Sequence, residues 1–180
     1  MDQGYTIEQI KEAQINGTDE NSNGVYNDLE AARKVYKLYP HFVCCHSVLY
    51  VFDDEAGIWS DKEEIIFKII SRFTDHLYLL TINNKGEVKV NKRGYGDSTV
   101  LKRQMIAELK PLCINDNWII KSQLSSIGKL LYLNGYYDMR TGIFYDAFNP
   151  DVVFYNKIYR KYEPNKRNND YIKDVITRFI

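Results

Sequence analysis

Apolar residues recur at the spacing of an amphipathic helix in four stretches of the chain, residues 27–39, 61–76, 98–109 and 115–127. Such a stripe is typical of a helix that buries one face against a core. Asn27 and Glu30 form a capping-box pattern at the start of the first helix, and Ser60 and Glu63 repeat it before the second. Pro111 is expected to lie beyond the end of the third helix, because proline does not continue a helix.

Short runs of β-branched and aromatic residues predict strands between these helices. Residues 42–52 form one such run, and an acidic turn at 53–57 leads to a partner strand at 57–60. Residues 77–83 are too few for periodicity to decide between a strand and an extension of the second helix. Residues 85–97, rich in Gly, Lys and Asn, are expected to form a hairpin or an extended loop.

Residues 129–150 have the pattern of a β-meander. Two short strands meet at Asn134 and Gly135, a pair that tolerates the positive φ angles of the tightest reversals. Gly142 allows a second bend before a third strand at 143–145. A tyrosine-rich run at 152–162 then predicts a further strand.

Together these elements predict an α+β fold, with small antiparallel hairpins and a meander among packed helices. The predicted parts are an acidic N-terminal arm and linker at 1–26, an α+β domain at 27–163, and a linker with the start of a helix at 164–180. Residues 1–30 carry seven acidic residues and one lysine, a net charge of −6. This charge favours a solvated tether, with an arm that competes with DNA for a basic groove as the alternative.

The composition adds that the chain is globular and carries no overall charge. It has 180 residues, 44% of them hydrophobic and 27% charged, and its net charge is zero. No apolar run approaches the roughly 20 residues that a membrane helix needs, and the N-terminus lacks the apolar core of a signal peptide. Three cysteines, two of them adjacent, indicate a reducing compartment and therefore an intracellular location.

Enzyme chemistry finds little support in the sequence. There is no phosphate-binding G-x-x-x-x-G-K-[ST] loop, so the chain is not expected to hydrolyse ATP. Asp53, Asp54 and Glu55 are the densest carboxylate cluster, but their place between two strands favours a turn over a two-metal site. We therefore predict no catalytic residues in this chain.

Metal binding is likewise not expected. Cys44, Cys45 and His46 are neighbours, and Cys113 is distant in sequence. Chelating pairs usually stand two to four residues apart, and neighbours on a strand point to opposite faces. Buried thiols that pack as small hydrophobic groups are the interpretation that follows.

The meander carries a pattern that resembles a viral protein family. Its spaced residues read NG-x-x-D-x-x-T-G, formed by Asn134, Gly135, Asp138, Thr141 and Gly142. This pattern resembles the signature of the domain that precedes the ATPase in superfamily 3 helicase-primases of poxviruses, other nucleocytoplasmic large DNA viruses and related phages. Trp59, at the end of an upstream strand–turn–strand, stands where that family has a tryptophan. The resemblance covers about residues 28–180.

The resemblance implies a role beside a motor. This chain would be a non-catalytic piece of a longer helicase-primase that lies before an ATPase module of the same polypeptide. It would need no cofactor itself, whereas ATP and Mg²⁺ would act in the parent protein, which would be hexameric. The expected location is the host cytoplasm or the viral replication site, without membrane attachment.

Basic residues suggest where DNA would bind. Residues 85–110 and 157–178 each carry seven cationic and three acidic residues, a net charge of +4, with tyrosines among them. Lysine and arginine neutralise phosphates, and aromatic rings stack on bases. The candidate DNA-binding residues are Lys85, Lys89, Lys92, Arg93, Tyr95, Lys102, Arg103, Lys157, Arg160, Lys161, Lys166 and Arg167.

Two functions remain open from the sequence. The first is a DNA-handling domain that contacts single- or double-stranded DNA without base readout and couples a primase to a motor. The second is a structural collar, whose tyrosine and isoleucine surfaces would join subunits without binding DNA. If the two basic segments share one face of the fold, they would form a groove for DNA.

Overall fold

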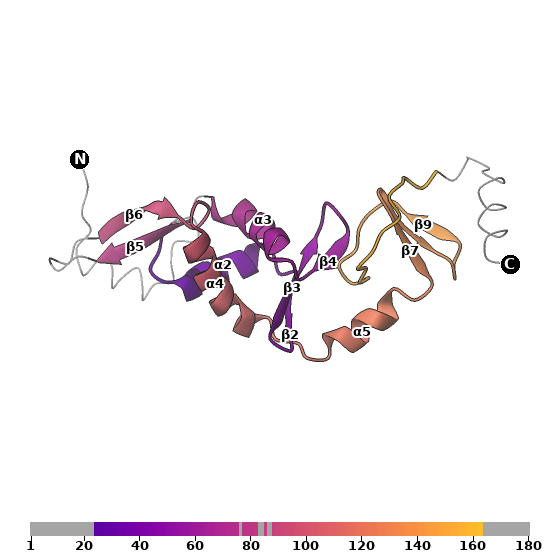
Figure 1. Cartoon of the computed structure of the whole chain (residues 1–180), viewed down its shortest axis with the longest axis horizontal. Coiled ribbons are helices and arrows are strands. Elements are labelled where there is room, and N and C mark those ends of the chain that lie inside the picture. The colour runs from indigo at the N-terminus through magenta and orange to yellow at the C-terminus, as the bar shows by residue number, and fades with distance from the viewer. Residues whose placement is uncertain (1–23, 76, 83–84, 86–87, 164–180) are drawn as a thin grey trace.

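The chain extends along one axis, from a helical lobe through a central sheet to a lobe built on the meander (Figure 1). The computed structural model describes residues 24–75, 77–82, 85 and 88–163, and the side chains of residues 82, 88–93 and 121 lie outside this description. The described strands form three three-stranded sheets. Helices and largely antiparallel sheets occupy separate regions, which confirms the predicted α+β class. The predicted N-terminal arm and C-terminal helix fall almost wholly outside the described residues.

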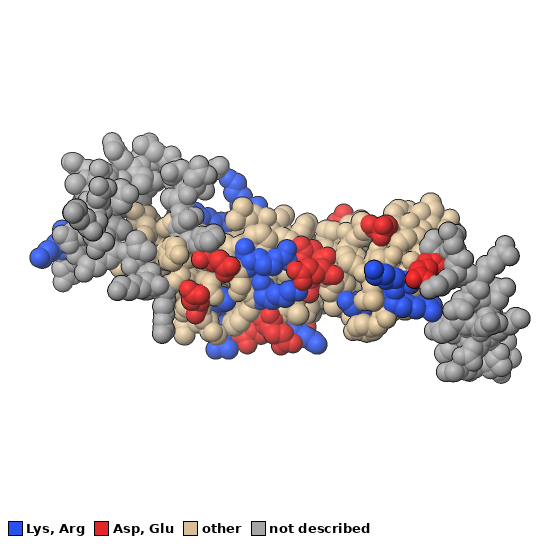
Figure 2. All heavy atoms as spheres, turned by 90° about the horizontal axis from the view of Figure 1, so that it is seen from above, with Lys and Arg blue, Asp and Glu red and all other residues tan. Residues whose placement is uncertain are grey.

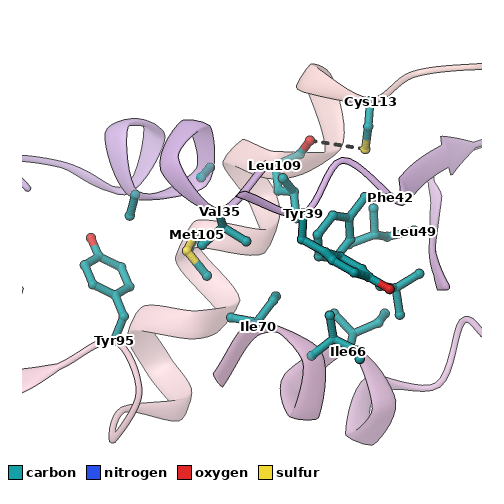
Figure 3. Packing of buried hydrophobic residues seen from close by; sticks show 14 of the residues in the cluster. Val35, Tyr39, Phe42, Leu49, Ile66, Ile70, Tyr95, Met105, Leu109 and Cys113 are labelled. Carbon is teal, nitrogen blue, oxygen red and sulfur yellow. Dashed lines mark hydrogen bonds between the residues drawn. The ribbon is translucent and has the colours of Figure 1, made fainter. Parts of the chain in front are cut away.

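The helical lobe contains β1 (Gly24–Val25), α2 (Asp28–Leu38), α3 (Glu63–Thr74), β5 (Tyr78–Ile82), β6 (Val88–Gly94) and α4 (Thr99–Leu112). Its core forms where the apolar faces of the three helices meet, with Val35, Ile70 and Met105 fully buried (Figure 3). The predicted cap of α2 is present, since Asn27 Oδ1 accepts a 2.8 Å hydrogen bond from the Glu30 amide. Periodicity therefore located these helices correctly.

The helical lobe departs from the prediction at the start of α3 and at Pro111, and it settles the structure of residues that the sequence left undecided. The helix α3 begins at Glu63 without a side-chain cap, because Ser60 Oγ accepts from the Lys62 amide. Pro111 lies inside the last turn of α4 and not beyond it. Within residues 77–83, Tyr78–Ile82 form a strand, β5, which pairs with β6 as an antiparallel hairpin. The hairpin expected within 85–97 is therefore only partly right, because those residues supply one strand, β6, and its partner β5 lies before them.

The central sheet consists of β2 (Phe42–Cys45), β3 (Val48–Asp53) and β4 (Ile58–Ser60). The single strand predicted at 42–52 is wrong, because His46 and Ser47 adopt positive φ angles of 48° and 67° and reverse the chain. Alternate residues of β3 enter two cores, with Val51 in the core of the helical lobe and Phe52 in a core with Trp59 and Trp118. The sheet is buried on both faces, which accounts for its continuous apolar run.

The meander lobe contains β7 (Lys129–Tyr132), β8 (Gly135–Asp138) and β9 (Ile143–Tyr145), followed by residues 146–163, and α5 (Trp118–Ser125) leads into it. The order β7-β8-β9 is the predicted meander. The strand predicted at 152–162 is not formed, and these residues run as an irregular extended segment. Within the described part of the chain, no helix has the length and apolar character needed to cross a bilayer.

Candidate nucleic-acid interface

Residues 155–162 of the meander lobe lie against β7 without forming a regular ladder. The Ile158 amide donates a 2.8 Å hydrogen bond to the Leu131 carbonyl, and the Leu133 amide donates a 3.0 Å bond to the Arg160 carbonyl. Two backbone bonds therefore fix this segment to the edge of the sheet. These bonds set the course of the segment along the sheet.

Asn134 holds the far end of the segment through both atoms of its amide. Its Oδ1 accepts a 2.7 Å bond from the Tyr162 amide, and its Nδ2 donates a 3.3 Å bond to the Tyr162 carbonyl. The asparagine side chain thus supplies an acceptor and a donor for the Tyr162 backbone, as a paired strand residue would. Asn134 was singled out as a turn residue, and its second role as a clamp is not visible in the sequence.

The other meander signature residues build its two turns. Gly135 has a φ of 143°, and a Cβ at this position would lie 2.0 Å from the Tyr145 carbonyl oxygen. Asp138 is buried, and its Oδ1 accepts a 2.9 Å bond from the Arg140 amide. Gly142 closes the same turn with a φ of 71° and an amide bond to the Asp138 carbonyl. These residues shape the backbone beside the 155–162 segment.

Trp59 joins the meander lobe to the central sheet. Its indole Nε1 donates a 2.9 Å bond to the Pro150 carbonyl, and its amide donates a 3.0 Å bond to the Phe154 carbonyl. Its ring lies 5.0 Å from that of Trp118 in an edge-to-face arrangement. Trp59 is therefore a structural residue that sets where residues 150–154 run, just before the basic segment.

The side chains of residues 155–161 combine exposed rings with positive charge. Tyr159 is 82% exposed and Tyr155 is 48% exposed. Lys157 Nζ lies 5.6 Å from the centre of the Tyr159 ring. Arg160 and Lys161 are exposed on the same segment. We call residues 155–161 the basic segment; it combines charge for phosphates with a ring that can stack on a base.

Two tyrosines near the basic segment are committed to the fold. Tyr162 stacks on Phe144 at 4.4 Å and on Tyr137 at 5.4 Å between ring centres. The Tyr155 hydroxyl lies 3.2 Å from Ser122 Oγ on α5. Tyr159 is thus the ring of this segment that is best placed to meet a base.

The basic candidates on α4 pair with α3. Lys102 Nζ donates a 2.7 Å bond to Ser71 Oγ, and the Arg103 guanidinium bonds both carboxylate oxygens of Glu63 at 2.8 and 3.3 Å. The bond from Arg103 holds the pKa of Glu63 below its usual value. Lys102 is half-buried and Arg103 is exposed, and both are engaged in contacts with α3.

Tyr95 is not a stacking residue, and its assignment to the DNA surface is wrong. The side chain is fully buried at the edge of the helical core (Figure 3). Its hydroxyl donates a 2.7 Å bond to Asp28 Oδ1. Burial raises the pKa of Tyr95 well above its usual value, and the hydrogen bond to Asp28 is the second-largest cause of the rise. The ring fastens the start of α4 to α2 and has no face toward solvent.

Five further candidates lie where their side chains are not described. Lys89, Lys92 and Arg93 belong to β6, of which only the backbone is described. Lys166 and Arg167 lie outside the described residues. Lys85 is exposed at the turn between β5 and β6.

The structure places the two predicted basic regions in different lobes. Residues 85–110 belong to the helical lobe, whereas the basic segment belongs to the meander lobe at the other end of the long axis (Figure 1). Figure 2 shows blue and red atoms side by side over the middle of the molecule and a further blue group over the meander end. A single compact groove lined by both regions is therefore not formed by the described residues.

The acidic cluster of the central sheet forms a turn, and basic side chains of α3 neutralise its negative charge. Arg72 bonds both oxygens of Asp54 at 2.6 and 2.9 Å, and Lys68 Nζ lies 2.6 Å from Glu55 Oε2. The buried Asp53 accepts bonds from the amides of the turn at 3.1 and 3.2 Å. This arrangement is the structural turn that the sequence favours.

The cysteine-rich turn differs from its prediction in one respect. Neighbouring residues on a strand would diverge, but His46 leaves the strand with a φ of 48°. Its Nδ1 lies 3.5 Å from Cys45 Sγ, and its amide donates a 3.1 Å bond to Asp116 Oδ1. Asp116 comes from a segment 70 residues away, so this cluster could not be predicted from local sequence patterns.

No protein-family model matches the chain. The chain is 29% identical over 136 residues to a protein of the Sputnik virophage named "Putative helicase V13". The aligned stretch covers 74% of this chain and 17% of the virophage protein. The similarity supports a viral helicase-related domain. Because the aligned stretch spans only 17% of that protein, the similarity does not assign the activity of the whole protein to this chain.

Proposed function

We propose that this chain is a non-catalytic DNA-handling domain of a viral replicative helicase-primase, placed before the ATPase module. The similarity to a viral protein named as a helicase supports the helicase setting. The NG-x-x-D-x-x-T-G pattern supports the position next to the motor, and the residues of the pattern build turns and a clamp. ATP, Mg²⁺ and a hexameric assembly belong to the parent protein in this proposal.

The two basic regions lie in different lobes, so the proposal does not use a groove between them, and the observation that carries it is the basic segment alone. Its backbone is fixed to β7, its cations are Lys157, Arg160 and Lys161, and Tyr159 stands exposed among them. Phosphate neutralisation releases counterions and needs no base contact, while stacking tolerates any base. We therefore expect binding to DNA that is independent of sequence and stronger on single strands.

The test is fluorescence anisotropy with a labelled single strand over a series of salt concentrations. Affinity should fall steeply with salt, and the triple variant Lys157→Ala, Arg160→Ala, Lys161→Ala should bind more weakly. Each phosphate contact on a single strand contributes about 0.7 to the slope of log K against log salt, so the slope should drop by about 2. Tight binding with an unchanged slope in the triple variant would contradict the proposal.

A matched control removes the same charge from the other lobe. Arg33, Lys37 and Lys62 are exposed in or beside α2 and α3. Replacing all three by alanine lowers the net charge equally without touching the meander lobe. If this control weakens binding as much as the first triple variant, overall charge and not the basic segment attracts the DNA.

A structural collar is the second candidate, because a row of apolar side chains is exposed beside the meander lobe. Ile120 and Leu124 on α5 are each 64% exposed, and Ile127 is 49% exposed. Ile120 and Leu124 are four residues apart and therefore lie on one side of α5, and Ile127 follows after the helix ends at Ser125. In this alternative the chain self-associates and binds no DNA at low salt. Sedimentation of Ile120→Ser with Leu124→Ser tests it, since dissociation of an oligomer would favour the collar.

A further inference from the structure

Three potential metal ligands converge at the turn between β2 and β3. They are the Cys45 thiol, the His46 imidazole and the Asp116 carboxylate, and one ligand atom from each lies within 4.8 Å of the others. Cys45 is buried, whereas His46 and Asp116 are exposed. The combination of sulfur, nitrogen and oxygen is a donor set that zinc accepts.

The two segments that supply these ligands are tied together by their backbones. The Cys44 amide donates to the Cys113 carbonyl at 2.8 Å, and the Asn115 amide donates to the Cys44 carbonyl at 2.9 Å. Asp116 follows directly, and its Oδ1 accepts from the His46 amide at 3.1 Å. The carboxylate is thus held beside the turn before any ion arrives, so little ordering is left for binding.

The separation of two of the donors matches that around a tetrahedral ion. Zn–S and Zn–N bonds of about 2.3 and 2.05 Å at the tetrahedral angle put sulfur and nitrogen about 3.6 Å apart. The separation of Cys45 Sγ from His46 Nδ1 is 3.5 Å. The positive φ of His46 is what turns its ring back toward the preceding cysteine. Adjacent residues can therefore act as a chelating pair here, although they could not on a straight strand.

We propose that Cys45, His46 and Asp116 bind a divalent transition-metal ion of the zinc type. The thiol loses its proton to solvent on binding, the neutral imidazole donates through Nδ1, and the carboxylate supplies an oxygen. Three protein ligands leave a fourth position, which faces the exposed side of the turn and takes water or a ligand from another molecule. The ion fastens the β2–β3 turn to the connection between α4 and α5.

The test uses Zn²⁺ for affinity and Co²⁺ as a spectroscopic probe on the full chain under reducing conditions. We expect one Zn²⁺ per chain, and Co²⁺ should give a thiolate charge-transfer band and the intense visible bands of a tetrahedral site. His46→Asn removes one ligand but suits the turn, since asparagine tolerates positive φ. It should weaken Zn²⁺ binding at least about 10-fold, and Asp116→Asn should do the same.

Two controls separate loss of a ligand from other effects. Ser47→Gly changes the same turn, where Ser47 has a φ of 67°, but keeps all three ligands and should bind Zn²⁺ as the unaltered chain does. Asp151→Asn makes the same carboxylate-to-amide change at an exposed site in the meander lobe. The absence of a thiolate band with Co²⁺, or equal Zn²⁺ affinity in His46→Asn and the unaltered chain, would overturn the proposal.

Discussion

Asn134 hydrogen-bonds the backbone of Tyr162 at both its amide and its carbonyl, at 2.7 and 3.3 Å. The asparagine that turns the chain between β7 and β8 therefore also holds the end of the basic segment. Tyr162 in turn stacks on Phe144 at 4.4 Å. One side chain thus connects the meander to the residues proposed to meet DNA.

Replacing Asn134 by alanine should destabilise the protein and loosen the basic segment. Loss of the bond to the half-buried Tyr162 amide leaves a donor without its partner, which costs about 1–3 kcal/mol in the free energy of unfolding. Urea unfolding measures this change. Asn134→Asp keeps the acceptor for the shorter bond and should lose less. Equal loss in both variants would show that the clamp is not the source of the effect.

The two glycines of the meander should differ in their tolerance of a methyl group. Both adopt positive φ, but a Cβ on Gly135 would lie 2.0 Å from a backbone oxygen, whereas the nearest atom to a Cβ on Gly142 is 3.8 Å away. Gly142→Ala should therefore cost only the left-handed backbone penalty of about 1–2 kcal/mol. Gly135→Ala should cost clearly more, because Tyr145 must move. Thermal unfolding of the two variants ranks them, and the reverse order would contradict the geometry.

Local patterns in the sequence predicted the helices and the meander, because helical periodicity and an Asn-Gly turn depend on neighbouring residues alone. The division of residues 42–52 was missed because His46 and Ser47 reverse the chain without glycine or asparagine. The segment at 152–162 reads as a strand, yet its end is paired by the Asn134 side chain and not by a ladder.

The candidate interface was predictable only in part. Lys157 and Tyr159 lie together because they are close in sequence, and their role at a DNA surface stays a prediction. Tyr95 also lies among basic residues in the sequence, but it is buried against Asp28, which is 67 residues away. The approach of Asp116 to His46 and the separation of the two basic regions also depend on tertiary contacts. Contacts between residues far apart in the chain cannot be predicted from the local pattern of a single sequence.

The ion pair between Asp54 and Arg72 should make stability depend on acid pH. The bond from Arg72 holds the pKa of Asp54 below its usual value, so the ionised carboxylate stabilises the fold above about pH 4. This contribution is lost as the pH falls through the folded-state pKa. Asp54→Asn should lose about 0.5–1 kcal/mol at pH 7, a small value because both side chains are more than one-third exposed.

Urea unfolding at pH 7 and pH 3 measures the Asp54 effect. The difference between Asp54→Asn and the unaltered protein should shrink toward zero at pH 3. Asp146→Asn, at an exposed position in the meander lobe, provides a carboxylate control that should show little change at either pH. A gap that stays constant with pH would assign the effect to something other than the ionised carboxylate.

Cys113 should resist alkylation in the folded protein. Burial raises the pKa of its thiol to about 11, so about one molecule in a thousand carries the thiolate at pH 8. Its Sγ also donates to the Leu109 carbonyl at 3.4 Å (Figure 3). Mass spectrometry after iodoacetamide treatment should find Cys113 unmodified in native protein and modified in urea. Rapid native labelling of this residue would contradict its buried position.

Tyr159 should contribute to DNA affinity without contributing to stability. Its ring is 82% exposed and its described contact is with Lys157 Nζ, so Tyr159→Ala should leave the free energy of unfolding within about 0.5 kcal/mol of the unaltered protein. If the ring stacks on a base, the same variant should lose about 1–3 kcal/mol of affinity for single-stranded DNA, a 5- to 150-fold change.

Tyr159→Phe separates stacking from hydrogen bonding by the hydroxyl. The phenylalanine ring keeps its face for a base, so this variant should bind close to the unaltered protein in the same anisotropy assay. Stacking also depends less on salt than phosphate contacts do, so Tyr159→Ala should lower affinity at every salt concentration with little change in slope. If Tyr159→Ala instead lowers the slope of log K against log salt and leaves the affinity unchanged, Tyr159 positions Lys157 and does not stack on a base.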